Sequence, residues 1–133
     1  MSKAEELFKA AMTVRENSYS PYSDYKVASA VLMENGEIYS GINVENSSYG
    51  ATICAERSAI CTAVSAGMKK IKEIVIITNN NPPGPPCGMC MQVISEFADK
   101  DTQVHLANTD GVQKSMSFSE LMPVQFHSSF LDQ

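Results

Sequence analysis

The sequence predicts an α/β fold, a three-layer α/β/α sandwich with a mixed five-stranded sheet. Helical and extended patterns alternate along the chain in the order α-β-β-α-β-α-β-β-α. Two turns that contain glycine lie between short apolar runs and indicate antiparallel hairpins. One extended run is β-branched almost throughout, which is typical of a strand that helices cover on both faces.

The amino-terminal part of the chain predicts one helix and one hairpin. Within residues 4–17, apolar side chains recur at i, i+4 and i+7, as on the buried face of an amphipathic helix. A turn-rich stretch follows at 18–23. Residues 26–33 and 37–44 then flank Asn35-Gly36, a dipeptide that is typical of tight hairpin turns.

The middle of the chain predicts two helices on either side of a buried strand. Residues 54–66 favour a helix that ends at Gly67, because glycine commonly follows the last helical residue. Residues 71–78 form the β-branched strand, and the proline-rich segment after it can be neither helix nor central strand. A second helix is expected at 88–98. Both helices are expected to cross over to a parallel neighbouring strand.

The carboxy-terminal part predicts a second hairpin and a short helix. Residues 102–107 and 112–116 are expected to be strands around a turn at 108–111. A last helix at 119–122 is expected to stop at Pro123. These strands complete the predicted sheet.

Composition and charge indicate a small globular domain that spans residues 1–133. At 14.5 kDa, with 44% hydrophobic and 19% charged residues, the chain has room for one ordinary core. Its net charge of -5 argues against a nucleic acid polymer or an anionic membrane as partner, because both attract cationic surfaces. No apolar run approaches the roughly 20 residues of a membrane-spanning helix, and the amino terminus lacks an apolar signal core. A cytoplasmic protein is expected.

Cysteine carries the strongest chemical signal in the sequence, at Cys54, Cys61, Cys87 and Cys90. Without an export signal, metal binding or catalysis is favoured over disulfide bonding. Cys54-Ala55-Glu56 and the later Pro86-Cys87-Gly88-Met89-Cys90 each lie where a helix is expected to begin. Either segment alone is a weak signal, since a lone Cys-x-x-Cys also occurs as a redox pair. Together they predict that three thiols meet at one point.

Three thiols suit a catalytic zinc site, which has three protein ligands and one open position, whereas structural zinc has four ligands. Cys61 lies seven residues after Cys54 on the same expected helix, about 10.5 Å along its axis. Two sulfurs on one zinc ion are at most about 4.6 Å apart, so Cys61 is excluded as a ligand and is expected to pack in the core. His105 and His127 lack ligand-like spacing and are expected to be structural or surface residues.

Glu56 and Arg57 follow the first of these cysteines directly. In the first helical turn, Glu56 can reach the open zinc position as a proton shuttle, or it can simply stabilise the positive end of the helix dipole. Three thiolates and a dication leave a net charge of about -1, which weakens the acidifying effect of the metal. Arg57 can offset this charge by hydrogen bonding to thiolates, or it can be a solvent-exposed helix residue.

These segments fit the all-cysteine variant of the zinc nucleobase deaminase signature. On its motifs, the chain resembles the small homotetrameric cytidine deaminases of pyrimidine salvage over nearly its whole length. The matching segments are Tyr19-Ser20-Pro21-Tyr22-Ser23 with Val27, Asn43-Val44-Glu45-Asn46-Ser47-Ser48-Tyr49-Gly50, Cys54-Ala55-Glu56-Arg57, Pro86-Cys87-Gly88-Met89-Cys90, Gln92-Val93, and Leu121-Met122-Pro123 with Phe126.

The resemblance implies a cytidine deaminase-like fold and hydrolysis of a cyclic amidine C–N bond. Cytidine and deoxycytidine would become uridine and deoxyuridine, with one Zn²⁺ per subunit supplying the hydroxide that attacks C4. Small nucleosides would be the substrates, without a nucleic acid polymer or membrane partner. The enzyme would be a homotetramer in which neighbouring subunits complete each site.

The resemblance also assigns roles to residues of this chain. Glu56 would be the proton shuttle, and Arg57 would neutralise the thiolates. The ligands of zinc would be Cys54, Cys87 and Cys90. The substrate-binding residues would be Asn43 and Glu45 at the ribose 3′-hydroxyl, Tyr25 where the family has phenylalanine, the backbone N–H of Ala55 at the pyrimidine, and Phe126 in a neighbouring subunit's site.

The chain departs from the family pattern away from the ligand set. Met91 replaces the usual arginine, Ala28 and Ser29 replace glycine and alanine, and the 82–86 segment is rich in proline. Two other functions fit parts of the sequence. One is a deaminase of the same fold that acts on another aminopyrimidine, such as a nucleoside antibiotic of the blasticidin S type. The other is a structural zinc module that binds protein or RNA, which needs a fourth protein ligand.

Overall fold

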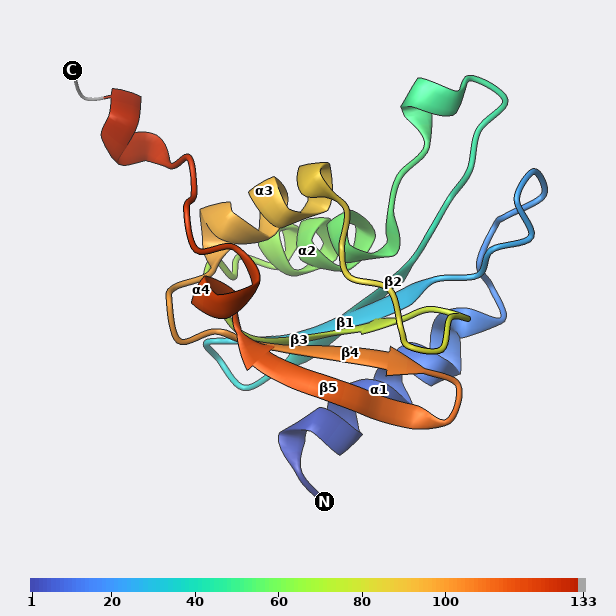
Figure 1. Ribbon diagram of the computed structural model, residues 1–133, viewed down its shortest axis with the longest axis horizontal. Helices are drawn as coiled ribbons and strands as arrows, with labels where there is room; N and C mark the ends of the chain where they lie inside the picture. The colour runs from blue at the N-terminus through green and yellow to red at the C-terminus, as the bar shows by residue number, and fades with distance from the viewer. Residues whose placement is uncertain (132–133) are drawn as a thin grey trace.

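A five-stranded mixed sheet forms the middle layer of the computed structural model, which describes residues 1–131. Helix α1 covers one face of the sheet, and α2 and α3 cover the other (Figure 1). The predicted three-layer sandwich is therefore confirmed. The strands are β1 (Ala28–Met33), β2 (Ile38–Ile42), β3 (Ile71–Ile77), β4 (Gln103–Asn108) and β5 (Gly111–Ser117). The helices are α1 (Lys3–Arg15), α2 (Ala55–Ser65), α3 (Gly88–Phe97) and α4 (Phe118–Leu121), with 3-10 turns at Tyr49–Ala51 and Ser128–Leu131.

The strands lie in the order β2-β1-β3-β4-β5. Only β3 and β4 pair in parallel, and α3 connects them as predicted. The prediction that α2 also leads to a parallel neighbour is wrong, because β1 lies between β2 and β3 and pairs antiparallel with both. Burial explains this order. All residues of β1 are buried whereas most of β2 is half-buried, so the more apolar strand of the hairpin takes the inner position.

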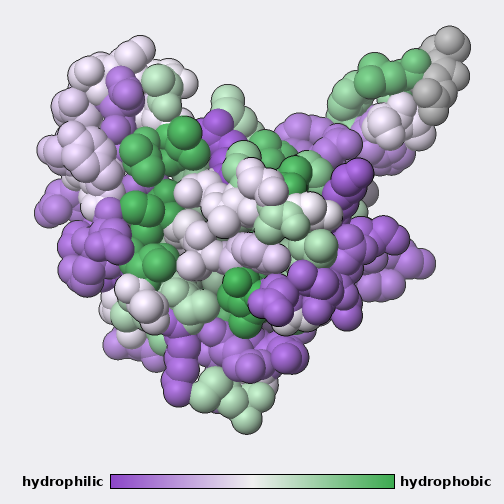
Figure 2. Space-filling model, turned by 180° about the vertical axis from the view of Figure 1, so that it is seen from behind, coloured by the Kyte–Doolittle hydropathy of each residue, from purple (hydrophilic) through white to green (hydrophobic). Residues whose placement is uncertain are grey.

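Two segments project from the body of the molecule, one with the turn Tyr49–Ala51 and the other the carboxy-terminal arm with Ser128–Leu131 (Figures 1 and 2). In the back view of Figure 2, pale and hydrophobic residues lie between these projections, over the outer side of α2. Within residues 1–131, no helix is long and apolar enough to cross a membrane.

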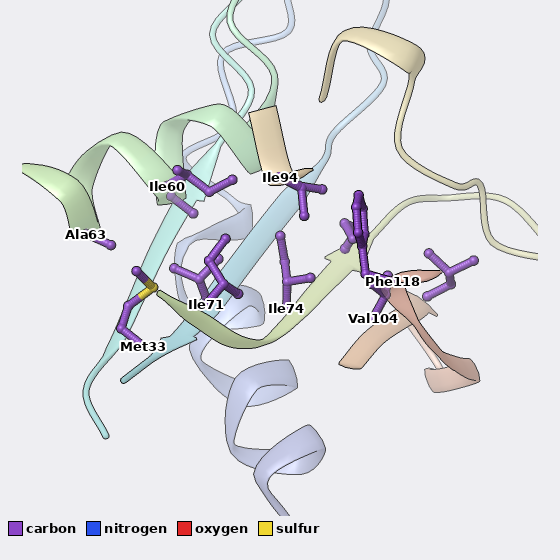
Figure 3. Close-up of a cluster of buried hydrophobic side chains, with 12 residues drawn as sticks. Met33, Ile60, Ala63, Ile71, Ile74, Ile94, Val104 and Phe118 are labelled. Atoms are coloured by element: carbon purple, nitrogen blue, oxygen red, sulfur yellow. The ribbon is translucent and has the colours of Figure 1, made fainter. Parts of the chain in front are cut away.

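Two clusters of buried side chains hold the layers together. The larger cluster packs α2 and α3 on the sheet, and Figure 3 shows its members pointing toward one another. The smaller cluster packs α1 on the opposite face. Successive residues of β3 alternate between the two, Ile74 and Ile76 facing α2 and α3, Val75 and Ile77 facing α1. The continuous β-branched run of this strand thus serves both cores. The residues labelled in Figure 3 are Met33, Ile60, Ala63, Ile71, Ile74, Ile94, Val104 and Phe118.

The ends of α2 follow from local sequence. At its carboxyl end, Gly67 has a φ of +96°, which glycine adopts without steric cost. Its N–H donates to the carbonyl of Val64 at 2.9 Å, and the N–H of Met68 donates to that of Ala63 at 3.1 Å. These two bonds form a Schellman motif and confirm the predicted stop. At its amino end, Cys54 is the N-cap residue, so the chemical signal and the helix start coincide.

Gly41 allows α2 to pack directly against β2. A Cβ atom at this position would lie 2.4 Å from the backbone nitrogen of Ala59 and 2.8 Å from the carbonyl carbon of Ser58. Real Cβ atoms do not approach other atoms so closely, and both neighbours are backbone that cannot rotate away. The strand and the helix therefore touch through their main chains.

The substitution Gly41→Ala should destabilise the protein because it forces these two backbones apart. We expect the free energy of unfolding to fall by about 1–3 kcal/mol, the typical cost of overpacking. Chemical denaturation of the zinc-loaded protein measures this change. Gly50→Ala is the matched control, since a Cβ there meets no atom within 4 Å. Equal stability of the two variants would contradict the close approach of β2 and α2.

Candidate metal centre and active site

Three cysteine side chains meet where α2 and α3 begin. Cys54 is the N-cap residue of α2, Cys87 is the N-cap residue of α3, and Cys90 lies in the first turn of α3. Their sulfur atoms all lie within 4.8 Å of one another. Zinc–sulfur bonds of about 2.3 Å place two sulfurs on one ion at most about 4.6 Å apart, so the spread of this group matches that of the ligands of one zinc ion.

The hydrogen bonds of the thiols favour a negative charge in the group. A hydrogen bond from the Cys90 thiol, with further help from Arg57 and against the effect of burial, lowers the pKa of Cys54 from 9.0 to about 5. The pKa of Cys90 is raised, because its proton bonds to Cys54 and because it is buried. The Sγ of Cys87 accepts the backbone N–H of Cys90 at 3.5 Å. A divalent cation would displace the remaining thiol protons and balance this charge.

Arg57 lies against the first of these thiols. Its Nη2 donates to the backbone carbonyl of Thr52 at 3.0 Å and to the Sγ of Cys54 at 3.7 Å. The bond to Thr52 holds the guanidinium in place, and the bond to the thiol raises the pKa of Arg57. Arg57 is therefore placed to offset thiolate charge, and it is not simply an exposed helix residue.

Glu56 is buried in the first turn of α2, with only 4% of its surface exposed. Burial raises the pKa of its carboxyl group above the usual value, and the nearby Cys54 thiolate acts in the same direction. A raised pKa makes this carboxyl group a stronger base, which favours its accepting a proton and then returning it as a general acid.

Glu56 shares the wall of one cavity of about 220 Å³ with two of the three cysteines, Cys54 and Cys87. Tyr25, Asn43 and Ala55, which the sequence analysis selected for substrate binding, also line it. Sequence reasoning did not select Thr52, Ile76, Thr78 or Pro85, although they line the cavity as well. A signal for Thr78 was available, because ligand sites in α/β folds lie beyond the carboxyl ends of the strands, and Thr78 directly follows β3.

Asn43 and Glu45 lie in different surroundings. Asn43 is buried, and its amide binds the backbone of the 18–27 segment: Nδ2 donates to the carbonyl of Tyr25 at 2.8 Å, and Oδ1 accepts the N–H of Val27 at 3.1 Å. Glu45 lines a neighbouring hollow and not the thiol cavity. There it accepts the hydroxyl of Ser23, the main cause of its lowered pKa, and the backbone N–H groups of residues 22 and 23. Thr52 lines both hollows and joins them.

Phe126 does not reach the thiol cavity of its own chain, as judged from the described residues. Its ring is 55% exposed and stacks on Phe130 with a centroid distance of 5.8 Å. Both rings belong to the carboxy-terminal arm that extends away from the sheet (Figure 1). The backbone carbonyl of Phe126 accepts the side-chain amide of Gln92 at 2.9 Å, and this bond connects the arm to α3.

The expectation that Cys61 packs in the core is wrong, because its side chain is exposed. The buried stripe of α2 runs through Ala55, Ala59 and Ala63, and Cys61 points away from it. It is outside the group of three sulfurs. His105 bonds across the sheet to Glu73 and Ser115, each at 2.7 Å, and His127 is exposed, so both lie in the kind of surroundings expected of them.

Comparison with known proteins agrees with this geometry. Residues 1–106 match the family model described as the cytidine and deoxycytidylate deaminase zinc-binding region. A cytidine deaminase of Halalkalibacterium halodurans is 42% identical over 120 residues, 90% of this chain and 91% of that protein. One from Sporosarcina psychrophila is 40% identical over 122 residues, 92% of this chain and 90% of that protein.

The fold comparison leads to the same group of proteins. The crystal structure of cytidine deaminase from Burkholderia pseudomallei superposes with a TM-score of 0.88 at 37% identity, covering 95% of this chain and 100% of that one. The family match includes all three cysteines that meet at the helix starts, together with Glu56. This chain therefore belongs to the family of zinc-binding cytidine and deoxycytidylate deaminases.

Proposed function

We propose that this chain, acting as one catalytic domain, deaminates cytidine and deoxycytidine by zinc-dependent hydrolysis. The observation that carries this proposal is the position of the buried Glu56 next to a group of three converging cysteine sulfurs, on the wall of a cavity that Cys54 and Cys87 also line. A structural zinc module would need a fourth protein ligand, and the metal-binding group within residues 1–131 contains three. Its relatives named cytidine deaminase support the nucleoside as substrate.

Glu56 performs the proton transfers of the reaction. When bound, zinc supplies hydroxide near neutral pH by lowering the pKa of water. Glu56 takes up the proton released from the water and donates it to N3 of the pyrimidine, which makes C4 more electrophilic. Once the hydroxide has added to C4 and formed the C4–O bond, Glu56 passes the remaining hydroxyl proton to the amino group, and ammonia leaves as the C4–N bond breaks. Because one carboxyl group acts first as base and then as acid, its fixed position in the first turn of α2 matters.

The neighbouring residues hold the nucleoside in place. We assign Cys54, Cys87 and Cys90 as zinc ligands and Arg57 as the group that offsets their charge. The N–H of Ala55, at the start of α2, binds the pyrimidine, and Tyr25 contacts the nucleoside. Asn43 and Glu45 bind the ribose 3′-hydroxyl near Thr52, where the two hollows meet. Buried polar groups that miss a partner are costly, so this arrangement favours a true nucleoside over other aminopyrimidines.

Assembly into a homotetramer would complete these sites. Val44 and Ile53 are 41% and 44% exposed, and they line a groove over the outer face of α2 with Ser58, Cys61 and Thr62. Phe126 lies on an arm that does not serve its own cavity and is therefore available to a neighbour. Four free cysteines suit a reducing compartment, and we infer a cytoplasmic location.

The substitution Glu56→Gln should abolish most turnover while leaving the fold and the metal unchanged. The amide keeps the size of the carboxyl group but cannot carry the proton, so we expect kcat on cytidine to fall by a factor of about 10²–10⁴. Loss of cytidine absorbance measures the rate, and zinc content is measured in the same sample. Substantial remaining deamination at full zinc content would exclude Glu56 as the shuttle.

The substitution Cys87→Ala should remove both zinc and activity. With two sulfurs left, the site no longer has the three ligands of a catalytic zinc centre, and we expect well below the wild-type content of about one zinc per subunit. Cys61→Ala is the matched control, because this exposed cysteine lies outside the sulfur group and should keep full zinc and rate. A fully metallated and active Cys87→Ala protein would remove Cys87 from the ligand set.

A mixed assembly tests the role of Phe126. The substitution Phe126→Ala should impair the site of the neighbouring subunit, whereas Glu56→Gln should inactivate the site of the subunit that carries it. In tetramers co-assembled from both variants, an intact Glu56 can meet a Phe126 supplied by the other subunit, so activity should exceed that of either parent. Parents purified separately and mixed without exchange are the control. No gain on co-assembly, or a fully active monomer by sizing, would refute this arrangement.

A further inference from the structure

A hydrogen bond joins two walls of the thiol cavity that come from distant parts of the sequence. The hydroxyl of Tyr25 donates to Oδ1 of Asn80. Tyr25 lines the cavity itself. Asn80 belongs to the loop between β3 and α3, which also supplies Pro85 and Cys87 to the cavity wall. The bond therefore connects an aromatic wall with the loop that delivers a cysteine.

Asn80 is well placed to act as a fixed acceptor. Its backbone carbonyl accepts the side-chain amide of Asn108 at 3.3 Å, which ties the loop to the end of β4. The N–H of Gly84 donates to Oγ1 of Thr78 at 3.0 Å and folds the loop back on itself. A Cβ at Gly84 would lie 3.4 Å from Oδ1 of Asn80 and 3.6 Å from the Tyr25 hydroxyl oxygen, so Gly84 packs against one side of the hydrogen bond.

Tyr25 is held at its backbone as well. Its N–H donates to the Oγ of Ser23 at 3.0 Å, and its carbonyl accepts Nδ2 of Asn43 at 2.8 Å. These bonds fix the main chain but leave the ring free to rotate about its side-chain bonds. The ring is 36% exposed, so packing alone does not restrain it fully. The bond to Asn80 supplies the restraint at the far end of the side chain.

We propose that Asn80 is a positioning residue for nucleoside binding, which holds the Tyr25 ring as a fixed wall of the cavity through the tyrosine hydroxyl. This inference rests on the proposed function. A phenylalanine, the residue that the resemblance leads one to expect at position 25, has no hydroxyl and cannot use this tether. Neither Tyr25 nor Asn80 carries the proton transfers or binds the metal in the mechanism above. The tether should therefore affect KM for cytidine much more than kcat.

Single and double variants of this pair test the proposal. Loss of one hydrogen bond should raise KM about three- to tenfold in Tyr25→Phe and in Asn80→Ala, with kcat changed by less than about twofold. The double variant should be no worse than the worse single variant, because both substitutions remove the same bond. Asn80→Asp keeps an oxygen acceptor and should restore a KM close to that of the wild type. Tyr39→Phe, on β2 and outside the residues that line the cavity, is the matched control.

Three results would overturn the inference: an unchanged KM in either single variant, additive effects in the double variant, or a fall in kcat in place of a rise in KM. Zinc content and binding of the product uridine by calorimetry are measured for every variant. A wild-type protein that deaminates cytidine while the variants behave like it would refute only the tether. A wild-type protein that neither deaminates cytidine nor binds uridine would refute both the tether and the proposed function.

Discussion

The meeting of two helix starts is the constraint on which the site depends. Both α2 and α3 lie on the same face of the sheet, and a cysteine is the N-cap residue of each. The amino ends of helices carry partial positive charge and unpaired N–H groups, which stabilise thiolates. Three sulfurs within 4.8 Å would otherwise repel one another once ionised. The layered fold thus supplies much of the electrostatic support that the metal ligands need, and Arg57 adds to it.

The same helix start controls Glu56. A carboxyl group that is 4% exposed is costly to ionise, and it remains tolerable because it follows the helix N-cap and lies near Arg57. Gly41 allows the backbones of β2 and α2 to touch, so the packing of α2 on the sheet helps to hold Glu56 in place. Gly41 lies two residues before the cavity residue Asn43, so one stretch of chain contributes both to the packing of α2 and to the cavity wall. Helix α2 thus links the packing of the sheet to the position of Glu56.

Local features could be predicted from the sequence, whereas relations between elements could not. Cys54, Cys87 and Cys90 were found because ligand chemistry and helix starts are both visible in short segments. The outward position of Cys61 was missed, because small residues such as Ala59 and Ala63 do not show which side of α2 is buried. The order of β1 and β2 was missed because either strand of a hairpin can take the inner place. Cavity members such as Thr52 and Pro85 depend on tertiary contacts that no local pattern contains.

The loop between β3 and α3 shows how a segment without regular structure can still be precise. Prolines at positions 82, 83, 85 and 86 have fixed φ angles and no backbone N–H, so this loop has few main-chain donors to hold it. Side-chain oxygens hold the loop by hydrogen bonds. Oγ1 of Thr78 accepts the N–H of Gly84, Oδ1 of Asn79 accepts Nη2 of Arg15, and Oδ1 of Asn80 accepts the hydroxyl of Tyr25. The prolines make the loop stiff, so it loses less conformational entropy on folding. A small number of hydrogen bonds can therefore place Cys87 beside the other thiols. Asn79 and Asn80, which precede the prolines, thus anchor this loop to Arg15 and Tyr25.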